Sequence, residues 1–120
     1  IMLVPAMLLG ARGSYSAAVS ANPLFMNRMF ELAEAHRWDE AMAMQSELSS
    51  LFYGVFAKMQ EWGLPGMDPV IDKALCAAAG FLTGHQRTRP PYIGWSDEDV
   101  ARLRDWWRET HPQLLAPPIP

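Results

Sequence analysis

The strongest constraint on the fold of this chain is an apolar stripe with helical spacing in the middle of the sequence. From about Asp39 to Trp62, apolar side chains recur every three or four residues, as they do along one face of an α-helix. Gly63 follows directly and can adopt the left-handed conformation that commonly ends a helix. The pattern predicts one long helix whose buried face consists of Ala41, Met44, Leu48, Leu51, Val55, Met59 and Trp62.

Start and stop signals predict three further helices. Asn22-Pro23 and Asp68-Pro69 each pair a capping side chain with a proline, and Pro at the first helical position loses only a donor that is unpaired there anyway. Ser96 and the three acidic residues after it resemble a capping box. We therefore expect helices that end near His36, at Gly80 and near Thr110, and an extended loop over residues 83–94.

The apolar run Ile1–Leu9 is open to three interpretations. A transmembrane helix needs about 20 apolar residues, and this run contains Pro5 and ends at Gly10. A signal peptide would require a basic segment at its start, which is absent. The preferred interpretation is a buried core segment, a short strand that leads into a tight loop of small residues over 11–21.

Composition narrows the possible functions. The chain has 120 residues, a formal charge of −3 and 50% hydrophobic residues, which indicates one folded domain or less and excludes intrinsic disorder. The absence of a basic run argues against a nucleic-acid partner. Cys76 is the single cysteine, so no internal disulfide can form and a cytoplasmic location is expected. The many Met and Trp side chains predict apolar surface that partners or a larger protein would cover.

Few side chains form a constellation that could carry chemistry. The histidines lie at predicted helix ends or in loops without metal-ligand spacing, and the acidic clusters begin helices, where capping explains them. Lys58 and Lys73 lie in amphipathic helices, whereas a Schiff-base lysine needs a desolvated pocket, although Lys73 has apolar neighbours. Cys76 is predicted to be a small buried side chain. The three histidines are His36, His85 and His111. We therefore predict no catalytic residue, metal or cofactor within the chain.

The segment Gly10-Ala11-Arg12-Gly13-Ser14-Tyr15-Ser16 is the best candidate for a binding loop. Two glycines at the end of a strand let the backbone approach a ligand closely, and free N–H and hydroxyl groups can hold a carboxylate there. A tight turn without a ligand explains the same residues.

The order of these motifs resembles the C-terminal part of the dihydrodipicolinate synthase/N-acetylneuraminate lyase family. An apolar run, the pattern of Gly10–Ser16, small residues and an Asn-Pro helix start occur in the order found there. The long helix, the helix that ends at Gly80, Arg89-Pro90-Pro91 and the stretch Ser96–Trp107 follow that family's last helices. The resemblance covers nearly the whole chain.

The resemblance implies an α/β fold, a (β/α)₈ TIM barrel with appended C-terminal helices. This chain would be the C-terminal part, mostly α-helical with one short strand. Residues 1–37 would be the end of the barrel, 38–111 the C-terminal helical segment and 112–120 a tail. Such barrels need about 250 residues, so most of the enzyme would lie outside this sequence.

The resemblance also implies an activity. Family members are class I aldolases or lyases that form a Schiff base between a barrel lysine and pyruvate or another 2-oxo acid, assisted by a tyrosine. Both residues belong to earlier strands, so the isolated chain is expected to be inactive. The implied partners are the 2-oxo acid, the remainder of the barrel and further copies in a homo-oligomer, often a tetramer, with no nucleic acid and no membrane.

Gly13, Tyr15 and Ser16 match the end of the family's last strand, and the resemblance implies that they bind substrate. Asn22 comes later than in the common pattern, and Tyr15 is larger than the usual aliphatic residue. These departures favour the hydratase-aldolases of aromatic pyruvate adducts, with sugar-acid lyases and dehydratases as the alternative. A second hypothesis is a free-standing helical interaction or oligomerisation module, whose Met-rich and Trp-rich faces bind partner helices.

Overall fold

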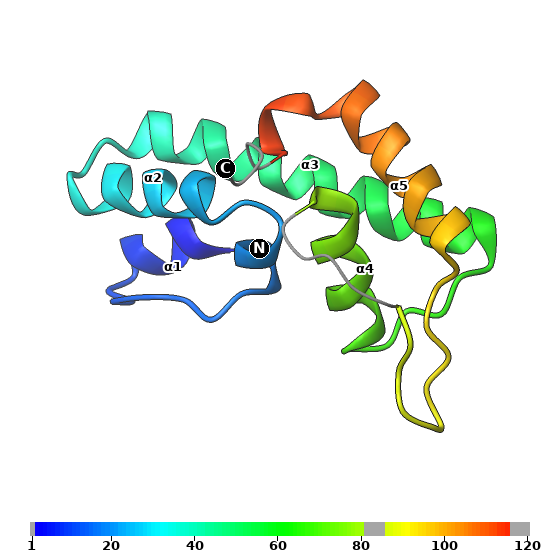
Figure 1. Ribbon diagram of the computed structural model, residues 1–120. Coiled ribbons are helices and arrows are strands. Elements are labelled where there is room, and N and C mark those ends of the chain that lie inside the picture. Colours follow the sequence, from blue (N-terminus) through cyan, green and yellow to red (C-terminus); the bar gives the residue numbers. More distant parts are fainter. Residues whose placement is uncertain (1, 81–85, 116–120) are drawn as a thin grey trace.

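The computed structural model, which describes residues 2–80 and 86–115, is all-helical in those ranges (Figure 1). No strand occurs in either range. In chain order the helices are α1 (Leu3–Leu8), the 3-10 helix η1 (Ala17–Ser20), α2 (Pro23–Glu34), α3 (Trp38–Trp62), α4 (Val70–Ala79), α5 (Asp97–Thr110) and the 3-10 helix η2 (Pro112–Leu114).

Local signals predicted most of the helix ends correctly. The Asn22 side chain accepts a hydrogen bond from the Phe25 N–H at 3.0 Å, which caps α2 as expected. Ser96 caps α5 by accepting the Asp99 N–H at 3.1 Å. Gly63 ends α3 with a φ of 66°, a conformation that a residue with a Cβ adopts only at a cost. α4 ends at Gly80 in the same way.

The predicted cap at the start of α4 is wrong. Asp68 makes no capping hydrogen bond, and the helix begins at Val70, one residue later than expected. The carbonyl of Met67 accepts the N–H groups of Val70 at 2.7 Å and Ile71 at 3.1 Å. A backbone carbonyl therefore serves the first turn, and the Asp68 side chain stays exposed.

The predicted strand is also wrong, and with it the assignment to an α/β TIM barrel. Leu3–Leu8 is α1, with Pro5 in the first turn, where backbone N–H groups lack an intrahelical partner anyway. The N–H of Val4, which lies in the same first turn, donates to the buried side-chain oxygen of Gln45 in α3 at 3.2 Å. An apolar run this short fits a strand or a helix equally well by periodicity, and no neighbouring strand among the described residues could bind its backbone groups.

α3 is the element on which the fold is built. It crosses the whole molecule, with α1 and α2 beside one half and α4 and α5 beside the other (Figure 1). η1 packs against both α2 and α4 and so connects the two groups. α5 contacts α3 closely at Gly54, where an added Cβ would lie 2.6 Å from the Trp106 ring. The Arg102 guanidinium also lies 4.1 Å from the centre of the Trp62 ring.

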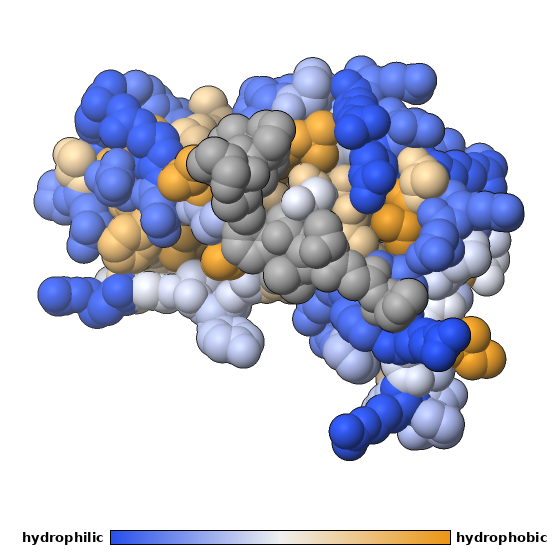
Figure 2. Space-filling view, viewed as in Figure 1, coloured by the Kyte–Doolittle hydropathy of each residue, from blue (hydrophilic) through white to orange (hydrophobic). Residues whose placement is uncertain are grey.

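The core lies between α3 and the helices on both of its halves. In the view of Figure 2, apolar residues gather in the middle of the molecule, and the outer ends are mainly hydrophilic. Leu114 of η2 is buried too, so part of the predicted tail over 112–120 packs on the core, whereas residues 116–120 lie outside the described ranges. The largest fully buried side chains are Trp107, Met29, Leu51, Leu75, Leu103 and Leu114.

Apolar side chains are nevertheless exposed at the start of the chain. Leu3 and Val4 are buried, as a core segment requires, but Leu8 is 53% and Leu9 90% exposed. The prediction of a buried apolar run therefore holds for the first turn of α1 only. Within the described ranges, no helix combines the length and apolarity needed to cross a membrane.

Candidate functional site

The loop between α1 and η1 contains the three residues that the resemblance implies as substrate-binding. Tyr15 is fully exposed, and the position that a Cβ would take on Gly13 has no contact within 4 Å. The Ser16 hydroxyl accepts a hydrogen bond from the Ala18 N–H at 3.2 Å and thereby caps η1. The structure thus places all three on an open loop, and their role in substrate binding stays a prediction.

The first residues of this loop, by contrast, line a cavity of about 390 Å³, which we call the junction cavity because α1, α2 and α3 meet there. Two backbone turns shape it. Gly10 ends α1 with a φ of 97°, and His36, with a φ of 58°, turns the chain from α2 into α3. The lining residues are Met7, Gly10, Ala11, Arg12, Phe30, Ala33, Glu34, His36 and Trp38.

The junction cavity combines aromatic walls with two opposite charges. The His36 ring stacks on Trp38, with 5.4 Å between the ring centres. Arg12 comes from the loop and Glu34 from the last turn of α2. Neither forms an ion pair or a hydrogen bond with any described residue through its charged group. Both charges are therefore available to a bound molecule.

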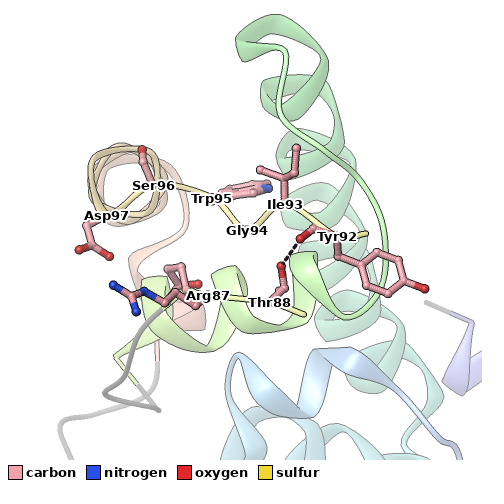
Figure 3. Close-up of a pocket in the computed structure, with 9 residues that line it drawn as sticks. Arg87, Thr88, Tyr92, Ile93, Gly94, Trp95, Ser96 and Asp97 are labelled. Carbon is pink, nitrogen blue, oxygen red and sulfur yellow. Dashed lines mark hydrogen bonds between the residues drawn. The ribbon is translucent and has the colours of Figure 1, made fainter. Parts of the chain in front are cut away.

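A second cavity, of about 650 Å³, lies in the loop before α5 and is lined by residues 86–88 and 92–97 (Figure 3). Several of its polar groups already have hydrogen-bond partners. The Thr88 hydroxyl donates to the Tyr92 carbonyl at 2.7 Å, and the Ser96 hydroxyl donates to the Asp99 carboxylate at 2.6 Å. Trp95 donates through its indole N–H to the Pro65 carbonyl at 3.0 Å. These bonds hold the loop and the start of α5.

Neither lysine lies in the desolvated pocket that a Schiff-base amine requires. The Lys58 ammonium binds the Glu61 carboxylate at 2.6 Å, and this hydrogen bond lowers the pKa of Glu61 below its ordinary value. The Lys73 ammonium donates to the Arg87 carbonyl at 2.5 Å on the exposed side of α4. The apolar neighbours of Lys73 face the core, so they do not surround its amine.

The described histidines and the cysteine lie at helix ends or in the core, and not in a cluster of possible metal ligands. His36 and His111 follow α2 and α5, as predicted, and His85 lies outside the described residues. The His111 Nε2 atom lies 3.2 Å from the Ser50 hydroxyl of α3. Cys76 is buried in α4. Within residues 2–80 and 86–115, no cluster of His, Cys, Asp and Glu side chains could hold a metal ion.

The sequence singled out this loop, and the residues that line the cavity are its first ones, not the three that the resemblance implies as substrate-binding. Gly13, Tyr15 and Ser16 stay open, whereas Gly10 and Arg12 meet Glu34 and Trp38. The meeting depends on the turn at His36, because that turn brings the end of α2 and the start of α3 to the loop. A positive φ is uncommon in a non-glycine residue but less so in His. A His at the predicted end of a helix was therefore the sequence signal for this turn.

Comparison with known proteins identifies no relative. The chain matches no family model, no curated protein and no solved structure.

Proposed function

We propose that this chain supplies the C-terminal helical portion of a Schiff-base-forming aldolase or lyase that acts on pyruvate or a related 2-oxo acid. The supporting observation is the position of the helix ends. α2 starts at Asn22-Pro23, α4 ends at Gly80 and α5 starts at Ser96, which are the points at which the motifs of the resemblance fall.

In this proposal the reactive amine comes from another part of the enzyme. A lysine amine condenses with the 2-oxo carbonyl, and water leaves to give an iminium. In cleavage, the hydroxyl group of the substrate loses its proton and becomes the carbonyl of the leaving aldehyde, while the iminium takes up the electron pair of the broken carbon–carbon bond as an enamine. In condensation, the iminium loses a proton to form the enamine, which supplies the pair for the new bond. Lys58 and Lys73 are engaged in hydrogen bonds on the surface and are not assigned this role. Tyr15 and Ser16, on the open loop, would border a substrate held by the remaining part of the enzyme in a homo-oligomer.

Reductive trapping tests this function. The complete protein containing these residues is treated with pyruvate and borohydride, and the adduct is located by mass spectrometry of peptides. We expect one adduct, on a lysine outside residues 1–120, and none on the 120-residue chain alone. Replacing both Lys58 and Lys73 by Arg in the complete protein should leave the adduct unchanged. An adduct on either of these lysines, or none on the complete protein, contradicts the proposal.

One observation favours the second candidate, a helical oligomerisation module. Half of the exposed large apolar side chains in the described residues belong to the first 24 positions: Met2, Leu8, Leu9, Tyr15, Val19 and Leu24. Exposed apolar side chains that form a contiguous patch mark an interface, and in this candidate a second copy covers them. Sedimentation of the 120-residue chain should then give one discrete oligomer that Leu9→Ser dissociates. Met67→Ser, at an exposed apolar residue elsewhere in the molecule, should not dissociate it. A monomer at all concentrations excludes this candidate.

A further inference from the structure

The junction cavity has the features of a small-molecule site rather than of a gap in the packing. Its volume, about 390 Å³, lies within the range of about 300–1,000 Å³ that is usual for ligand pockets. Its base is firm, because Ala33 has no exposed surface and Phe30 packs against the core. It is formed by three different helices, so its shape depends on the whole fold.

The walls favour a flat apolar group. Phe30 and Trp38 are both half-buried, and Met7 of α1 adds a polarisable thioether. Aromatic rings bind other rings by stacking or by edge-to-face contact. The stack of His36 on Trp38 also holds the indole in place before a ligand arrives.

The charges at the cavity favour a ligand with two opposite charges. Two pairs of charges nearby are satisfied within α2 and α3: Arg28 lies 3.5 Å from Glu31, and Arg37 makes two hydrogen bonds to Glu40. Arg12 and Glu34 line the cavity and have no such partner among the described residues, nor do they pair with each other. A guanidinium is suited to binding a carboxylate, and a carboxylate accepts hydrogen bonds from an ammonium group.

We propose that the junction cavity binds a small aromatic zwitterion, of the chemical class of a free aromatic amino acid. The ring lies against Phe30 and Trp38, the carboxylate binds Arg12, and the ammonium group binds Glu34. This site is separate from the residues named for the 2-oxo acid, and the inference does not depend on the aldolase function.

Binding of four related probes to the 120-residue chain tests the proposal. L-phenylalanine carries both charges, and N-acetylphenylalanine amide carries neither. Phenylacetate carries only the negative charge, and phenethylamine carries only the positive one. Binding is followed by the indole N–H resonance of Trp38, assigned with Trp38→Phe. We expect saturable binding of L-phenylalanine with a Kd of about 1 mM. Phenylacetate and phenethylamine should each bind about fivefold more weakly, and the neutral amide most weakly of all.

Charge variants then assign each contact. Arg12→Gln should weaken the binding of L-phenylalanine and phenylacetate about fivefold and leave the binding of phenethylamine unchanged. Glu34→Gln should weaken the binding of L-phenylalanine and phenethylamine about fivefold and leave the binding of phenylacetate unchanged. Arg28→Gln and Glu31→Gln, exposed on another part of α2, are the matched controls and should change nothing. Circular dichroism checks that each variant is folded.

Three results would overturn the proposal. The first is the absence of a saturable shift of the Trp38 resonance with L-phenylalanine at about ten times the expected Kd. The second is binding of phenylacetate as tight as that of L-phenylalanine, since Glu34 would then contribute nothing. The third is equal behaviour of the Arg12 and Arg28 variants, which would place the carboxylate elsewhere.

Discussion

The start of the chain and α4 are both rich in apolar side chains, yet they are attached to the molecule in different ways. In α4, eight of the ten residues are buried, and α5 covers them. In α1, two of the six residues are buried, and the helix is held at Gln45 by one buried hydrogen bond. Apolar composition alone therefore does not decide how firmly a segment packs. Both helices have neighbours, since α1 also contacts α2 and α3, and the difference lies in how many side chains of the segment those neighbours cover.

The largest effect should come from Trp107, the largest fully buried side chain, on the inner face of α5. Trp107→Ala should lower the free energy of unfolding by about 3–5 kcal/mol, because it opens a cavity between α5 and the rest of the core. Urea denaturation followed by circular dichroism measures the loss. Leu8→Ala in α1, where the side chain is half exposed, should change stability by less than about 0.5 kcal/mol. Equal losses in the two variants would remove the contrast between the two regions.

A further variant separates volume from hydrogen bonding at this position. The Trp107 indole N–H is buried and makes no hydrogen bond to any residue that the structure describes. A buried donor without a partner costs about 1–3 kcal/mol. Trp107→Phe keeps a ring and removes this donor, so it should cost much less than Trp107→Ala. Because both variants remove the N–H, equal destabilisation would mean that the volume of the ring contributes little at this position.

The next largest effect concerns the polar attachment of α5 to α4. The Arg104 guanidinium donates to the Ala77 carbonyl at 2.6 Å and to the Ala78 carbonyl at 3.2 Å, at the end of α4, where the helix dipole favours a positive charge. Arg104→Met keeps much of the side-chain length and removes both bonds, so it should lower stability by about 2 kcal/mol. Arg108→Met is the control: that arginine is largely exposed and lies 3.7 Å from Asp105, and its loss should cost less than about 0.5 kcal/mol.

The same contrast explains what the sequence could predict. α2, α3 and α5 were found because their caps and stripes are local, and Asn22, Gly63 and Ser96 act within one helical turn of themselves. α1 was mistaken for a strand because its conformation depends on the Gln45 side chain, 41 positions away. The junction cavity was missed for the same reason, since Arg12 and Trp38 meet only after three helices have packed. Sequence patterns report local preferences, and such contacts are not local.

The contact between Gln45 and Val4 provides a direct test of how α1 is attached. Replacing Gln45 by Met keeps apolar volume in α3 and leaves the buried N–H of Val4 without its acceptor. We expect a loss of about 1 kcal/mol and, because this bond fixes the first turn of α1, faster hydrogen exchange at the amides of Val4 and of residues 6–9. Exchange in α4 and α5 should not change. Acceleration throughout the chain would mean that α1 unfolds only with the whole domain.

The smallest effect should appear at the exposed end of α3, far from α1, where Lys58 binds Glu61. The hydrogen bond and the charge of Lys58, with a smaller contribution from the charge of Arg102, lower the pKa of Glu61 in the folded state. A carboxyl group with a lowered folded pKa stabilises the protein above its unfolded pKa, and the stabilisation is lost as the pH falls through the folded value.

Lys58→Met should therefore raise the pKa of Glu61 toward the ordinary value of 4.5, as measured by its side-chain carboxyl resonance during an acid titration. Stability at neutral pH should change little, because the pair is exposed and screened by solvent. Lys73→Met removes an equally exposed lysine from α4 and should leave Glu61 unaffected. If the pKa of Glu61 does not move when Lys58 is replaced, the 2.6 Å contact is not maintained in solution, and the end of α3 is held by the contact between Arg102 and Trp62 instead.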